Sequence, residues 1–198
     1  MEELETQIRD ELIAIRDVLQ ELLGRPSRWT EEVEITDDFL AYGHARWGGR
    51  ISLSRDIIQS DARWRTQIHE LLHTFSVGLM PDAYSQFRGW EEGVVEQLQR
   101  HFRPLVLARL SLPIPDHFFA ALEREHSANR YIETLNVMGV LLRQPSPDFF
   151  ISLLGVPLVD RPAYVLEARH TLPVERQAEF RRYFASSFSL MRGSRFHV

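Results

Sequence analysis

The 198-residue sequence contains no cysteine. Disulfide bonds, thiolate metal ligands and a cysteine nucleophile are therefore all excluded. No stretch approaches the ~18 uninterrupted apolar residues of a membrane-spanning helix, so we expect no membrane association. Residues 1–23 carry charges throughout and have no continuous apolar segment, which is unlike a signal peptide. We therefore expect a cytoplasmic protein, with secretion by a leaderless route left open.

The chain also lacks an excess of basic residues. It has 23 Lys and Arg against 28 Asp and Glu, a formal net charge of -5, and this balance argues against nucleic-acid binding. Several arginines do gather between residues 176 and 195, where a solvated helix face explains them at least as well as a binding patch. The 44% hydrophobic content is ordinary for a globular protein and is enough for a core. The length favours a single domain over residues 1–198.

An amphipathic helix is predicted over residues 2–23. Its apolar residues recur at spacings of three and four, and Gly24 followed by Pro26 ends the pattern. We expect this stripe to pack in the core, with a homodimer through residues 2–23 as the alternative.

Short strands are predicted next, because the apolar period changes after residue 32. Val33 and Ile35 alternate with polar residues, Phe39–Tyr42 is strand-like, and Ile51–Ser54 forms the last strand. Residues 47–50, Trp-Gly-Gly-Arg, indicate a hairpin turn. We therefore expect three short antiparallel strands.

The rest of the sequence indicates mainly helices. One is expected from about Asp61 to Val77 with Gly78 as its C-terminal cap, and a second from near Gly89 to just before Pro104. The fold class is therefore α+β and mainly α, with an N-terminal helix (1–24), a sheet with two helices (30–103) and a helical C-terminal part (104–198). The expected helical segments of this last part are 116–125, 127–143, 146–154 and 174–191.

One motif indicates a metal site: His69-Glu70-Leu71-Leu72-His73, a match to H-E-x-x-H. Residues four apart lie one turn apart on the same face of a helix, so His69 and His73 can reach one metal ion. Glu70 is rotated by about 100° from His69, which is too far for a ligand but near enough to reach a water on the metal. The motif lies inside a good amphipathic helix.

After His73 come 18 residues and then Glu92, in the run Gly89-Trp90-Glu91-Glu92-Gly93. Here the sequence resembles the gluzincin metalloproteases, whose third zinc ligand is a glutamate on a second helix. In the aminopeptidase branch the pattern is HExxH, 18 residues, Glu, commonly within W-x-x-E-G; Trp90 stands one place closer than that. The resemblance covers about residues 50–100 and implies a zincin-like fold with Zn²⁺ held by His69, His73 and Glu92.

Glu91 and Glu96 are alternatives for the third ligand. Glu91 projects into the middle of the apolar face of its helix, which suits a ligand less well than the flank occupied by Glu92. Glu96 stands where the thermolysin-like branch has a carboxylate that steadies a metal-bound histidine. We therefore expect Glu96 to accept a hydrogen bond from the ring of His69 or His73.

The resemblance implies a zinc peptidase acting on a peptide or protein substrate, in which Glu70 takes a proton from the zinc-bound water. A second donor is needed for the oxyanion. Tyr131 is the first candidate and Tyr84 the second, and three histidines follow them: His126, His117 and His170. The Ile51–Ser54 strand resembles the edge strand that gluzincins pair with substrate, and a plain structural strand is the alternative.

Two other functional classes stay open. One is an inactive zincin-fold regulatory or protein-binding module with a retained metal site. The other is a helical assembly protein that oligomerises through residues 2–23. The intact Glu70 and histidines favour the enzyme.

Overall fold

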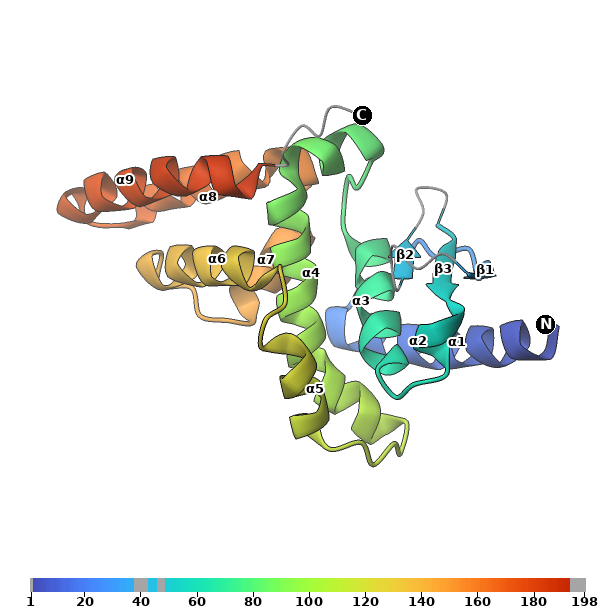
Figure 1. The fold of residues 1–198 in the computed structure, drawn as a ribbon. Helices are drawn as coiled ribbons and strands as arrows, with labels where there is room; N and C mark the ends of the chain where they lie inside the picture. Colours follow the sequence, from blue (N-terminus) through green and yellow to red (C-terminus); the bar gives the residue numbers. More distant parts are fainter. Residues whose placement is uncertain (1, 38–42, 46–48, 193–198) are drawn as a thin grey trace. The chain divides into compact units, whose positions relative to one another are not determined.

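The computed structural model describes residues 2–37, 43–45 and 49–192 and is mainly helical (Figure 1). It contains two compact units. One comprises residues 1–75 and 99–124, and the other comprises residues 76–98 and 125–198. In the described part of the chain, no helix is both long enough and apolar enough to cross a membrane.

The first unit begins with α1 (Glu2–Leu23), which confirms the helix predicted over residues 2–23. Four residues of its apolar stripe are fully buried, and α1 packs against β1 and α3. Gly24 ends the helix with φ +64°, and its N–H donates to the Gln20 carbonyl at 2.9 Å. The buried residues of the stripe are Ile8, Leu12, Ile15 and Leu19. The predicted packing role of the stripe is therefore confirmed.

The sheet of the first unit has the order β1-β3-β2, formed by β1 (Val33–Thr36), β2 (Gly43–Ala45) and β3 (Ile51–Ser54). β2 runs antiparallel to β3, but β1 runs parallel to it. The prediction of an antiparallel sheet is therefore wrong for β1. Alternation marks a strand, but it carries no information on the direction of its neighbour.

The position of β3 corrects a second expectation. β3 is the central strand, hydrogen-bonded on both sides, so it is not an edge strand that can pair with a substrate. The edge strands are β1 and β2, and β2 pairs with β3 through the register Gly43 to Leu53. The predicted strand Phe39–Tyr42 lies outside the described residues, as do Trp47 and Gly48 of the predicted turn.

α2 (Arg55–Ile58) and α3 (Arg63–Phe75) follow the sheet. Ser54 caps α2, because its hydroxyl accepts from the Ile57 N–H at 3.4 Å. α3 confirms the helix expected at residues 61–77. It packs against α1 and β2 and buries the predicted apolar face. The members of this face are Trp64, Ile68, Leu71, Leu72 and Phe75.

α4 (Pro81–Arg109) is longer at both ends than predicted. It begins eight residues before Gly89, with a kink at Phe87 (φ -125°, ψ 30°), and it continues through Pro104. A proline inside a helix costs ~3 kcal/mol. Val106 and Leu107 beyond it are buried, and this burial outweighs the local preference to stop. Residues 81–98 of the helix belong to the second unit, whereas residues 99–109 and α5 (Asp116–Glu123) belong to the first.

The rest of the second unit is helical: α6 (Asn129–Leu141), α7 (Asp148–Leu154), α8 (Arg161–Ala168) and α9 (Val174–Met191), with 3-10 turns η1 (Leu158–Asp160) and η2 (Arg169–Thr171). α6, α7 and α9 confirm the predicted segments, and α6 packs against α9 (Figure 1). α8 was not predicted; it has only eight residues, with Pro162 in its first turn. Together with the first unit, this confirms an α+β fold that is mainly α.

Candidate metal centre

The two histidines of the motif lie one turn apart on α3. Their Nε2 atoms are 3.2 Å apart, and the ring centroids are separated by 4.9 Å with an interplanar angle of 79°. His73 is buried and His69 is half-buried. Two neutral imidazole nitrogens at this distance either share one proton or direct both lone pairs at a common cation. The arrangement therefore suits a metal ion.

Glu70 is held on the β2 side of α3. Its side chain is only 7% exposed. A Cβ added at Gly43 in β2 would lie 2.9 Å from Glu70 Cγ and 2.6 Å from Thr66 Cγ2, both closer than real side chains approach. Glycine at this position therefore lets the β2 backbone pass directly against the carboxylate side chain.

Glu92 lies in the second unit on α4, where its Oε1 accepts a short hydrogen bond from the hydroxyl of Tyr84. On a straight helix, residues eight apart are separated by about 12 Å along the axis. The kink at Phe87 folds the first turns of α4 back and so lets Tyr84 reach Glu92. One oxygen of Glu92 is thus fixed by a hydroxyl donor.

His69, His73 and Glu92 form a group that can hold a metal ion. One ring nitrogen from each histidine and one carboxylate oxygen lie within 4.8 Å of one another, and no second group of this kind occurs in the described residues. In a tetrahedral zinc site, ligand atoms are about 3.3 Å apart. The 3.2 Å between the Nε2 atoms matches that edge. Two imidazoles and one carboxylate are a donor set typical of catalytic zinc, so the residues fit this metal.

Glu91, one alternative third ligand, forms an ion pair elsewhere in the second unit. Its Oε2 accepts from Arg161 Nη1 at 2.8 Å and from Ser76 Oγ at 2.7 Å, and both charged side chains are fully buried. Arg161 also donates to the carbonyls of Trp90 at 3.1 Å and Val156 at 3.3 Å. Burial lowers the pKa of Arg161, and the Glu91 carboxylate opposes this effect. The candidate metal-binding group therefore contains Glu92 and not Glu91.

Glu96, the other alternative, is also fully buried. Its Oε1 lies 3.9 Å from His126 Nδ1, an ion pair when the imidazole is protonated. This contact places a candidate oxyanion donor, His126, beside a carboxylate instead. The predicted hydrogen bond from His69 or His73 to Glu96 stays a prediction.

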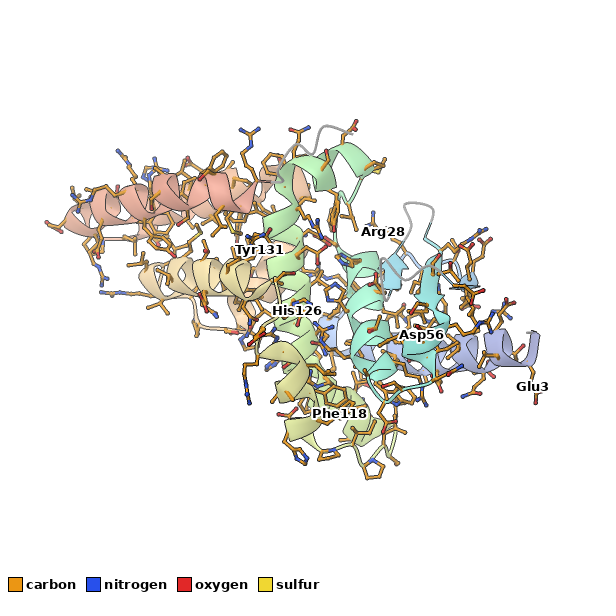
Figure 2. All side chains as sticks on the ribbon, viewed as in Figure 1. Glu3, Arg28, Asp56, Phe118, His126 and Tyr131 are labelled. Atoms are coloured by element: carbon orange, nitrogen blue, oxygen red, sulfur yellow. The ribbon has the colours of Figure 1, made fainter. Side chains whose placement is uncertain are left out.

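Tyr131 lies near the start of α6, a few residues after His126 (Figure 2). Its ring fits against α4 at two glycines, since a Cβ at Gly89 would lie 2.9 Å from Tyr131 Cδ1 and one at Gly93 would lie 3.0 Å from Tyr131 Cβ. These glycines flank Glu92 in the sequence. Tyr131 is therefore next to the turn of α4 that contains the candidate ligand Glu92. Two other candidate donors, His117 and His170, are exposed.

Sequence reasoning missed three contributors to this centre. Gly43 was detectable in principle, because glycine within a strand-like stretch often marks a close backbone approach. Arg161 was not, since arginine is normally a surface residue and nothing local indicates burial. The contact between Tyr84 and Glu92 depends on the kink at Phe87, which no pattern in the sequence indicates.

Comparisons of the chain with protein-family models, with curated proteins and with solved structures find no match. The functional assignment therefore depends on the residues themselves.

Proposed function

We propose that the chain is a zinc-dependent peptidase whose metal is held by His69, His73 and Glu92. The observation that carries the proposal is the convergence of two imidazole nitrogens and one carboxylate oxygen within 4.8 Å. Three protein ligands leave a fourth zinc position for water or substrate, which is the mark of a catalytic site. Glu70, adjacent to one ligand in the sequence and almost buried, supports catalysis over a purely structural metal.

Bound zinc supplies Lewis acidity, which polarises a carbonyl and makes a water molecule acidic enough to lose its proton near neutral pH. Glu70 is the general base in this proposal: it accepts the proton from water and later gives it to the leaving amine. Its carboxylate is oriented by packing against β2 at Gly43, so it does not have to be immobilised during the reaction. Tyr131 remains the proposed donor to the oxyanion.

The edge strand β2 is the proposed binding element for an extended peptide. β2 pairs with β3 on one side, and within the described residues no strand pairs with its other side. A substrate adding to this edge would run beside Gly43, whose Cα approaches Glu70. Substrate and general base would then be close together.

The alternative is a zincin-fold binding module that retains the metal without catalysis. It makes the same prediction for metal content and the opposite one for peptide cleavage. The donor set alone does not distinguish them, but the buried carboxylate of Glu70 beside the histidines favours the enzyme.

Elemental analysis of purified protein tests the proposed ligands. We expect about one zinc per chain, no zinc in His69→Ala or His73→Ala, and strongly reduced zinc in Glu92→Ala. Glu133→Ala, an exposed glutamate on α6 outside the group, serves as the control that keeps its zinc. Full occupancy in Glu92→Ala would remove this residue from the site, and a metal-free wild type after zinc reconstitution would refute the proposal.

A further inference from the structure

The second unit contains two exposed arginines close to the turn that carries Glu92. Arg88 is on α4, one helical turn before Glu92, and Arg130 is on α6. Each guanidinium lies over the ring of a tyrosine, Arg88 over Tyr84 and Arg130 over Tyr131.

Arg88 is held by its aromatic neighbour. Its guanidinium carbon lies 5.9 Å from the centroid of the Tyr84 ring, and Tyr84 in turn donates to Glu92. The pKa of Arg88 is raised, chiefly by Tyr84 and further by Glu92 and Tyr131, so the side chain stays protonated at any physiological pH. The positive charge therefore lies near both tyrosines and the candidate zinc ligand.

Arg130 approaches the same turn from α6. Its Nη2 donates to the Tyr131 hydroxyl at 2.8 Å, and its guanidinium carbon lies 4.8 Å from the centroid of the Tyr131 ring. Tyr131 packs against Gly89 and Gly93, on the two sides of Glu92 in the sequence. Tyr131 thus contacts Arg130 directly and also raises the pKa of Arg88.

We propose that Arg88 and Arg130 form a subsite that binds a carboxylate of the peptide substrate. The planar guanidinium presents several N–H groups in a fixed fork that matches a carboxylate, and contact with an aromatic face limits the rotamers that binding must select. The carboxylate is either the free C-terminus of the peptide or the side chain of Asp or Glu. The subsite rests on the proposed peptidase function, because it places this anion next to Glu92.

Three pools of acetylated hexapeptides test the subsite. The randomised positions contain no acidic residue in any pool. One pool ends in a carboxylate, one ends in a carboxamide, and the third ends in a carboxamide and carries one Asp at a fixed position. Zinc-loaded wild type is compared with Arg88→Gln/Arg130→Gln and with the control Arg181→Gln/Arg182→Gln, which removes two charges from α9. Initial cleavage rates are read by mass spectrometry, and the zinc content of each variant is measured.

We expect wild type and the control to cleave one of the two carboxylate-bearing pools about tenfold faster than the neutral amide pool. Charge-assisted hydrogen bonds stabilise binding by enough to give a rate difference of this size. The Arg88→Gln/Arg130→Gln variant should keep its zinc and lose the preference. A preference for the free-acid pool identifies a C-terminal carboxylate, and a preference for the Asp pool identifies a side chain. Equal cleavage of all pools by wild type, or a preference that survives in the double variant, overturns the subsite.

A second readout separates this subsite from the peptidase function. Fluorescent versions of the same pools are titrated against zinc-free protein, and binding is followed by polarisation. If wild type binds no zinc and cleaves nothing, the peptidase function fails, and the binding data decide the subsite alone. Tighter binding of carboxylate pools that is lost in Arg88→Gln/Arg130→Gln supports it, whereas equal binding of all pools overturns it.

Discussion

Arg161 and Glu91 form an ion pair in which both side chains are fully buried, with 2.8 Å between Nη1 and Oε2. Ser76, the first residue after α3, completes the network through its hydroxyl. Glu91 immediately precedes the candidate ligand Glu92. The network therefore fixes the first part of α4 in the second unit and occupies the carboxylate that would otherwise compete for the metal.

Breaking this pair from one side should be far more damaging than removing it altogether. Arg161→Met leaves Glu91 buried without a counter-ion, and we expect a loss of about 3–5 kcal/mol in the free energy of unfolding. Glu91→Leu/Arg161→Met removes both charges and should recover most of that loss. Urea denaturation of the three proteins measures the difference. Equal destabilisation of the single and double variants would mean that the charges do not act as a pair.

The helices were largely predictable because their apolar faces repeat along the chain. α1 and α3 bury the residues that the periodicity selects. Gly24 ends α1, whereas α3 ends at Phe75, three residues before the predicted cap Gly78. The ends of α4 were not predictable, because Pro104 is a strong local stop signal that only tertiary burial of Val106 and Leu107 overrides. The parallel pairing of β1 with β3 is likewise set by the path of the chain between them.

Tyr84 should act on the metal through Glu92. Tyr84→Phe removes the hydroxyl that donates to Glu92 Oε1, and groups that orient metal ligands typically contribute 10–100-fold in affinity or activity. We expect zinc affinity to fall by at least about tenfold, measured by competition with a chromophoric chelator. Tyr164→Phe on α8 is the matched control and should bind zinc as wild type does. Unchanged zinc affinity with lost turnover would instead make Tyr84 the oxyanion donor.

Gly43 should be intolerant of a side chain. In Gly43→Ala the new Cβ would overlap Thr66 Cγ2 at 2.6 Å and Glu70 Cγ at 2.9 Å, so we expect ~1–3 kcal/mol of destabilisation and slower cleavage with zinc retained. Thr66→Ser removes the closest atom. Combined with Gly43→Ala, it should restore part of the stability, measured by thermal unfolding, but not turnover, because the overlap with Glu70 Cγ remains. Wild-type turnover in Gly43→Ala would show that Glu70 does not depend on this contact.

The part of the candidate site that depends on residue spacing within one helix was predictable. His69 and His73 are four residues apart on one helix, so their convergence follows from helical geometry alone. Glu92 was identified through a resemblance and the apolar face of its helix, and the structure groups it with the histidines. The surroundings were not predictable, because Arg161 and Gly43 approach the centre from distant parts of the sequence.

The central claim is that Glu70 takes a proton from water at a zinc centre held by its neighbours. The most direct test measures zinc content and cleavage of a mixed peptide library side by side for wild type and Glu70→Gln. Glutamine is nearly isosteric, so the variant should bind one zinc per chain and unfold as wild type does, while cleavage falls by about 10²–10⁴-fold. Undiminished cleavage by zinc-loaded Glu70→Gln would contradict the account, because the hydrolysis would then not depend on this carboxylate.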